Sequence, residues 1–178
     1  GYAYFNTKQY SQASSNFQKY VSAENDRKNP TYADALNRLG DCQLFARKFA
    51  DAERYYSQAV SANPSGADYA EYQKAFVLGL QRDYSAKVSA LDNMMSKYPT
   101  SRYYPDALYE KSRALIMQNK EQAAIPVLEK LLKEYPTHEV TKQGGIQLGQ
   151  VYFNVNDASN SIKAYKHVVE TYPNTVES

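Results

Sequence analysis

Few residues of the chain are of the types that catalyse reactions or bind metals. It has two histidines, His138 and His167, and one cysteine, Cys42. Neither histidine has a cysteine or a second histidine at the spacing that zinc sites use. We interpret both histidines as solvent-facing side chains, and Cys42 as a small buried residue on a helix. The sequence therefore predicts no metal site, no cofactor and no internal disulfide framework.

Two further patterns resemble parts of catalytic or ligand sites. The paired acids Glu24 with Asp26, and Glu129 with Glu134, would serve acid/base chemistry only if they converged across a cleft, and their spacing indicates solvated helix faces. Gly144-Gly145 lacks the preceding strand and the following Gly-Lys-Ser/Thr of a phosphate loop, so it predicts close helix approach or a weakened turn. We therefore expect no enzyme activity, and no catalytic residue is assigned.

Composition limits the possible partners of the chain. It has 178 residues with a formal net charge of +2, both charge signs are interspersed, and no linker divides it. This pattern favours one continuous architecture and argues against binding to nucleic acid. Its apolar stretches fall short of the roughly 20 residues that cross a bilayer, so we expect no membrane insertion. Its 18 tyrosines, against 6 phenylalanines and no tryptophan, suit half-buried positions in a thin assembly.

Regular proline spacing indicates an internal repeat. Successive intervals of 34, 35, 37 and 37 residues separate Pro30, Pro64, Pro99, Pro136 and Pro173. Between them lie two runs with apolar residues at helical spacing, joined by a short polar turn. The expected turns are residues 45–49, 80–84, 117–121 and 153–157. Each repeat is therefore predicted to be helix, turn, helix.

Proline chemistry predicts how these helices begin and end. Each of the repeating prolines is expected to end the second helix of its unit, and Ser65, Thr100 and Thr137 to cap the helix that follows. Pro105 is expected to begin a helix, where its missing amide hydrogen costs nothing. Pro126 is expected to cause a mild kink in the second helix of its unit.

The best-formed unit spans residues 31–64, with small and large residues where paired helices must touch. These residues are Leu36, Leu39, Gly40, Phe49, Ala52, Tyr56, Ala59 and Pro64. The set resembles the tetratricopeptide repeat, and this resemblance implies an all-α, right-handed superhelix of antiparallel helix pairs. We expect a single array over residues 1–178, with units at 1–30 (truncated), 31–64, 65–99, 100–136 and 137–173, and a further unit starting at 174–178. The third unit has Lys87 where a small residue is expected, which indicates a snorkelling side chain or a shifted register.

Three sequence phrases are also similar to tetratricopeptide domains of bacterial envelope proteins, namely outer-membrane assembly lipoproteins and the Tol-Pal coordinator. They are Tyr98-Pro-Thr-Ser, Pro105-Asp-Ala-Leu-Tyr and Leu131-Leu-Lys-Glu-Tyr-Pro. This similarity favours a periplasmic or envelope-associated location, with a cytoplasmic one as the alternative. Apolar residues at both ends, Tyr2 and Phe5 and then Val176, are expected to meet further repeats of a larger protein.

The family lines its concave groove with the first helix of each unit, which implies a set of partner-binding residues here. They are Tyr2, Phe5, Asp34, Asn37, Asp41, Phe45, Tyr69, Tyr72, Phe76, Tyr109, Arg113, Ile116, Gln150 and Phe153. This aromatic set is typical of a surface that binds protein. The alternative is that these side chains bury against neighbouring units.

The expected function is a protein-interaction scaffold that holds a peptide or helix in this groove. Family members that bind chaperone tails clamp a terminal carboxylate with basic groove residues, but here only Arg113 is basic, so we expect no such clamp. A ligand with apolar anchors and a basic residue for Asp34 and Asp41 fits better. The alternatives are a segment for self-association or spacing, and an accessory to a catalytic domain elsewhere in the protein.

Overall fold

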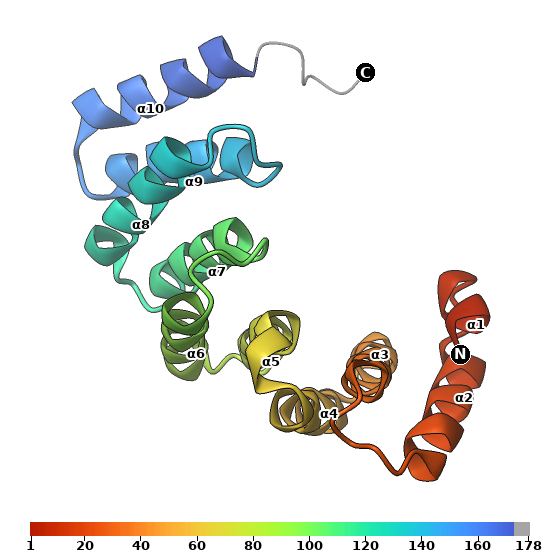
Figure 1. Ribbon diagram of the computed structural model, residues 1–178. Coiled ribbons are helices and arrows are strands. Elements are labelled where there is room, and N and C mark those ends of the chain that lie inside the picture. The colour runs from red at the N-terminus through yellow and green to blue at the C-terminus, as the bar shows by residue number, and fades with distance from the viewer. Residues whose placement is uncertain (173–178) are drawn as a thin grey trace. The chain divides into compact units, whose positions relative to one another are not determined.

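The computed structural model describes residues 1–172, and these residues form ten α-helices and one short 3-10 helix. The expected all-α fold of helix pairs is confirmed, whereas the further unit expected at residues 174–178, with Val176, lies outside the described residues (Figure 1). Within residues 1–172, no helix is both long and apolar enough to cross a bilayer. The α-helices are α1 (Tyr2–Asn6), α2 (Tyr10–Ala23), α3 (Pro30–Phe45), α4 (Phe49–Ala62), α5 (Asp68–Leu80), α6 (Tyr84–Lys97), α7 (Tyr104–Ile116), α8 (Glu121–Glu134), α9 (Thr141–Asn154) and α10 (Ala158–Thr171), with η1 (Pro64–Gly66) before α5.

The helices form two units, divided after Lys97. Unit 1 holds α1 to α6, where each helix packs on the next along the chain. Unit 2 begins at Tyr98, and its helices α7 to α10 pack in the same sequential way. A single array over both units stays a prediction.

Every first helix ends in the same kind of turn. One residue per turn takes a left-handed conformation, with φ between 57° and 65°: Lys8, Arg47, Arg82, Asn119 and Asn156. The next amide donates a hydrogen bond to a carbonyl five residues back, as from Lys48 to Gln43 and from Asp83 to Leu78, both at 2.9 Å. This 6→1 bond defines a Schellman turn, so the expected turns within the pairs are confirmed.

The expected helix starts are partly wrong. Pro30 begins α3 instead of ending the helix before it, and the Asn29 side chain caps α3 by accepting a 3.0 Å hydrogen bond from the Thr31 amide. Ser65, Thr100 and Thr137 do not cap the next α-helices, which begin three to four residues further on, at Asp68, Tyr104 and Thr141. Ser65 is instead part of η1, and Thr100 and Thr137 lie in turns closed by backbone hydrogen bonds from Ser101 to Tyr98 and from His138 to Tyr135.

The other two prolines lie inside helices. Pro105 is the second residue of α7, where its missing amide hydrogen leaves no hydrogen bond unmade. Pro126 lies in the second turn of α8, and that helix continues through it to Glu134.

Small residues on the first helices let aromatic rings of the second helices approach closely. A Cβ atom added to Gly40 would lie 2.5 Å from Cε1 of Tyr56, a side chain with no exposed surface. Gly149 has the same relation to Tyr165, at 2.7 Å. The core of unit 1 forms around this contact, with Leu36 and Leu39 also fully buried.

Gly144-Gly145 serves the close helix approach expected from the sequence. A Cβ atom added to Gly144 would lie 2.7 Å from Cδ2 of Leu131 on α8. One added to Gly145 would lie 2.5 Å from Cγ2 of Val168 on α10. The two glycines therefore bring α9 into contact with the helix before it and the helix after it.

Substituting Gly145→Ala is expected to lower the free energy of unfolding by about 1 to 2 kcal/mol. The new methyl group overpacks against the buried Val168, and this cost exceeds the roughly 1 kcal/mol by which alanine favours a helix interior. Gly149→Ala is the matched control, because its neighbour Tyr165 is 37% exposed and can move aside. Urea denaturation measures both. An alanine at position 145 that stabilises as much as one at position 149 contradicts the packing argument.

Lys87 on α6 is buried, with 6% of its surface exposed, so it does not snorkel to solvent. Its side chain occupies the space beside Gly79, where an added Cβ atom would lie 2.8 Å from the lysine Cδ. Its Nζ lies 5.8 Å from the ring centre of Phe76, a cation–π contact. The absence of a side chain at Gly79 thus makes room for this lysine.

Candidate protein-binding face

Unit 1 brings most of its predicted groove residues together on the side formed by α1, α3 and α5. The Tyr2 hydroxyl donates a hydrogen bond to Asp34, which joins α1 to α3. The rings of Phe5 and Phe45 make the same connection edge to face, with centroids 6.4 Å apart. We call the side chains of Tyr2, Phe5, Phe45, Tyr69, Tyr72 and Phe76 the first-helix face.

Asp41 lies beneath this face as the centre of a polar cluster. It is 3% exposed, and one carboxylate oxygen accepts hydrogen bonds from Tyr56 at 2.8 Å and Tyr69 at 2.6 Å. Arg38 donates to its other oxygen at 2.5 Å. Burial raises the pKa of the Asp41 carboxyl, and the Arg38 guanidinium and the two phenols oppose that rise.

Arg38 connects the cluster to the face, and the sequence interpretation missed it. Its Nε lies 3.5 Å from Asp34, and its guanidinium lies over the rings of Phe5 at 5.5 Å and Tyr69 at 5.1 Å. Arg38 follows Asp34 by four residues and precedes Asp41 by three. This spacing places all three side chains along one helix face, and it was the signal available in the sequence.

The two carboxylates expected to receive a basic residue already have partners in the chain. Asp34 accepts from Tyr2 and pairs with Arg38, and Asp41 is surrounded by donors. Burial, followed by the hydrogen bond to Asp34, raises the pKa of Tyr2 to about 12. The chain's own Arg38 thus occupies the place that the sequence analysis assigned to a partner.

Aromatic and apolar surface remains on the first-helix side after this internal pairing. Phe45 is 56% exposed and stacks on Tyr10, with ring centroids 4.2 Å apart. Tyr72 and Phe76 are half-buried one turn apart on α5, and Leu80, one turn further, is 44% exposed. Asn37, also half-buried, lies on α3 one turn before Asp41.

Unit 2 places its predicted residues on α7 and α9. Tyr109 and Ile116 are half-buried and pack against the core of this unit. Arg113 pairs with Glu110 at 2.7 Å. Gln150 and Phe153 are exposed, the latter at 66%. Part of the predicted set is therefore packing surface, and Phe153 is its most exposed apolar member.

The cysteine and the two histidines do not form a reactive or metal-binding site in the described part of the chain. Cys42 is buried, as expected, and burial raises the pKa of its thiol to about 11. His138 is half-buried instead of solvent-facing, and its Nε2 lies 3.8 Å from Asp106. His167 is exposed on α10. In the described part of the chain, no three His, Cys, Asp or Glu side chains are grouped so that they could hold a metal ion.

Comparison with protein families gives three matches, all to models described as tetratricopeptide repeat. They cover residues 1–67, 106–138 and 146–175. No curated protein sequence shows significant similarity to the chain.

Solved structures share the fold. A structure of MamA from Desulfovibrio magneticus RS-1, from its residue 41 to its end, is 15% identical with a TM-score of 0.80, and the match covers 98% of this chain and 92% of that one. A putative kinesin light chain from Podosopora anserina, with nearly identical TPR-like repeats, is 14% identical with a TM-score of 0.75, over 99% of this chain and 93% of that one. YrrB, titled a TPR protein with an unusual peptide-binding site, is 16% identical with a TM-score of 0.68, over 88% and 75% of the two chains.

Proposed function

Because this chain belongs to the tetratricopeptide repeat family, we propose that it is a protein-interaction scaffold that binds a polypeptide segment on its first-helix face. The observation that carries the proposal is the aromatic surface left after internal packing, with Phe45 56% exposed and Tyr72 and Phe76 half-buried one turn apart. Rigid aromatic side chains supply large contact area and dominate protein interfaces. YrrB, which shares the fold, is itself described as having a peptide-binding site.

The proposed ligand is an extended or helical segment with apolar anchors. A basic anchor is not part of the proposal, because Arg38 already pairs with Asp34 and Asp41. Anchors that pack on the exposed ring of Phe45, or on Tyr72 and Phe76 of α5, would contact this aromatic surface. Exposed Phe153 extends the same proposal to unit 2.

Selection from a displayed library of random peptides tests the binding face. Peptides that bind the chain are expected to carry apolar side chains at a recurring spacing. Tyr72→Ala should weaken their binding about thirtyfold, as expected when a central aromatic anchor worth about 2 kcal/mol is removed. Isothermal titration calorimetry measures the change. Tyr20→Ala, which removes a half-buried tyrosine from α2, is the matched control and should leave affinity unchanged.

Two results would count against this function. Equal weakening by Tyr72→Ala and Tyr20→Ala would indicate general destabilisation, and circular dichroism would detect it. Sedimentation at several concentrations tests the self-association alternative. If the wild-type chain dimerises and Tyr72→Ala makes it monomeric, a second copy occupies the first-helix face instead of a separate partner.

The finer placement among bacterial envelope proteins is also a proposal. It is supported by the similarity of Tyr98-Pro-Thr-Ser, Pro105-Asp-Ala-Leu-Tyr and the run ending at Pro136 to repeats of such proteins. Fractionation of cells that produce the natural protein tests it. Recovery in the cytoplasmic fraction would reject the periplasmic assignment.

A further inference from the structure

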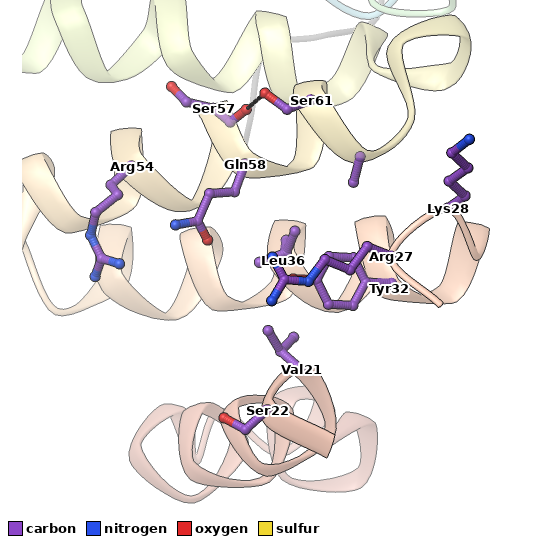
Figure 2. A pocket seen from close by; sticks show the side chains of 11 residues that line it. Val21, Ser22, Arg27, Lys28, Tyr32, Leu36, Arg54, Ser57, Gln58 and Ser61 are labelled. Carbon is purple, nitrogen blue, oxygen red and sulfur yellow. Dashed lines mark hydrogen bonds between the residues drawn. The ribbon is translucent and has the colours of Figure 1, made fainter. Parts of the chain in front are cut away.

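A cavity of about 830 Å³ opens in unit 1 on the side of the second helices, between α2 and α4. Its apolar lining includes Val21 and Ala62, which are half-buried, and Tyr32, which is 9% exposed. Arg27, Arg54 and Gln58 also line it, and Figure 2 shows Arg27 and Tyr32 toward one end, Arg54 toward the other, and Gln58 between them. None of these side chains belongs to the first-helix face.

The cavity lining is positively charged. It contains three cationic side chains, Arg27, Lys28 and Arg54, and no carboxylate. Arg27 and Lys28 have no ion-pair partner among residues 1–172. Arg54 pairs with Asp51 at 3.1 Å, and both of these side chains are about half exposed. Such exposed pairs are weak and exchange readily for another carboxylate.

The two acids nearest to Arg27 in the sequence, Glu24 and Asp26, accept hydrogen bonds from other groups and do not pair with Arg27. Glu24 accepts hydrogen bonds from the Tyr20 hydroxyl at 3.0 Å and from the Asp26 amide at 2.9 Å. Asp26 accepts from the amide of Lys28 at 3.0 Å. The loop between α2 and α3 therefore uses its carboxylates to order its own backbone. The two cations of this loop, Arg27 and Lys28, line the cavity and can pair with a ligand.

We propose that this cavity binds an acidic polypeptide segment in which an apolar side chain is flanked by carboxylates. The apolar side chain packs on Val21 and Tyr32, and the flanking carboxylates pair with Arg27 at one end and Arg54 at the other. The exposed amide of Gln58 lies between them as a donor for the segment's backbone carbonyls. Cations at both ends of an apolar lining match an acidic chain better than one compact anion.

Fluorescence anisotropy with a labelled peptide, Gly-Glu-Asp-Leu-Asp-Glu-Gly, tests the proposal on the full chain. Removing both loop cations in Arg27→Gln/Lys28→Gln should weaken binding at least about fivefold, the upper range for one exposed ion pair. The matched control Lys48→Gln/Arg82→Gln removes the same charge from exposed turn residues outside the cavity and should bind as the wild type does. Both variants change exposed side chains, so the fold should be retained.

Peptide variants separate the parts of the proposed site. Replacing leucine by glycine, or the four acids by their amides, should each reduce binding, because the apolar lining and the cations act together. Tyr72→Ala should leave binding of this acidic peptide unchanged. Failure of the cavity proposal can therefore be told apart from failure of the proposal for the first-helix face. Equal loss in both double variants would overturn the proposal in favour of nonspecific charge attraction. Full displacement of the peptide by an equal concentration of inorganic phosphate would overturn it in favour of a simple anion site.

Discussion

Substituting Arg38→Met is expected to lower the free energy of unfolding by about 3 kcal/mol, the low end of the range for breaking a buried ion pair. Asp41, at 3% exposure, would keep its charge and its two phenol donors but lose the guanidinium 2.5 Å away. Methionine retains the apolar stem of the side chain, so most of the loss comes from the uncompensated carboxylate. The low end applies because the Arg38 side chain is itself 24% exposed.

The pH dependence of this loss distinguishes charge from packing. Because burial holds the pKa of Asp41 above its ordinary 3.8, the folded state binds this proton more tightly than the unfolded state. The contribution of Asp41 to stability is therefore greatest below pH 3.8 and falls as pH rises through the raised pKa. Without Arg38 that pKa rises further. The difference in free energy of unfolding between Arg38→Met and the wild type should thus be largest at neutral pH and become smaller in acid.

Urea denaturation at neutral and acidic pH measures both effects. The double variant Arg38→Met/Asp41→Asn is the control, because an amide in place of the carboxylate leaves no buried charge without its partner. It should recover most of the stability lost in Arg38→Met. A loss that is the same at both pH values, and is not recovered by the double variant, would show that Arg38 stabilises the unit through packing alone.

The helix pairs were predictable because their signals are local. Proline spacing and polar turns mark where one helix stops and the next starts, and the structure has a left-handed residue in each of the turns within the helix pairs of residues 1–172. The exact helix starts were less predictable. Thr100 and Thr137 are good capping residues, but the length of the connection decides which residue reaches the cap position.

The candidate site was only partly predictable, because position on a helix does not tell how a side chain is used. Asp41 lies at a groove position by spacing, yet it is buried because Tyr56 and Tyr69 converge on it from two other helices. The cavity between α2 and α4 had no sequence signal. Its cations are Arg27 and Lys28 in the loop before α3 and Arg54 on α4. No sequence motif links these positions, so their proximity could not be predicted.

Gly79 and Lys87 are expected to behave as a coupled pair with an interaction energy of about 2 kcal/mol. At one-repeat spacing, the positions equivalent to Gly79 hold Leu44, Ile116 and Phe153, and those equivalent to Lys87 hold Ala52, Ala124 and Ser161. The third helix pair, α5 and α6, thus has a small residue, Gly79, where the other pairs have a large one. It has a large residue, Lys87, where they have a small one. The lysine stem fills the space beside Gly79 that a side chain there would take.

Each single reversal should therefore destabilise unit 1. Gly79→Leu forces its side chain against the buried Lys87, at a cost of about 1 to 3 kcal/mol. Lys87→Ala leaves the space beside Gly79 unfilled, with the loss expected of a cavity. The double variant places leucine where the lysine stem was. It also removes a glycine from the last turn of α5, which favours the helix by less than the roughly 1 kcal/mol of an interior position. It should be at least as stable as the wild type.

A double-mutant cycle by urea denaturation measures the coupling. Gly40→Leu/Lys87→Ala is the matched control, because a Cβ atom at Gly40 would meet Tyr56 at 2.5 Å, and removing the lysine does not relieve that contact. Lys87→Ala should therefore rescue leucine at position 79 and fail to rescue it at position 40. Additive single effects at both positions would mean that the exchange of sizes is incidental. Rescue at position 79 alone would show how an irregular repeat keeps the packing of a regular one.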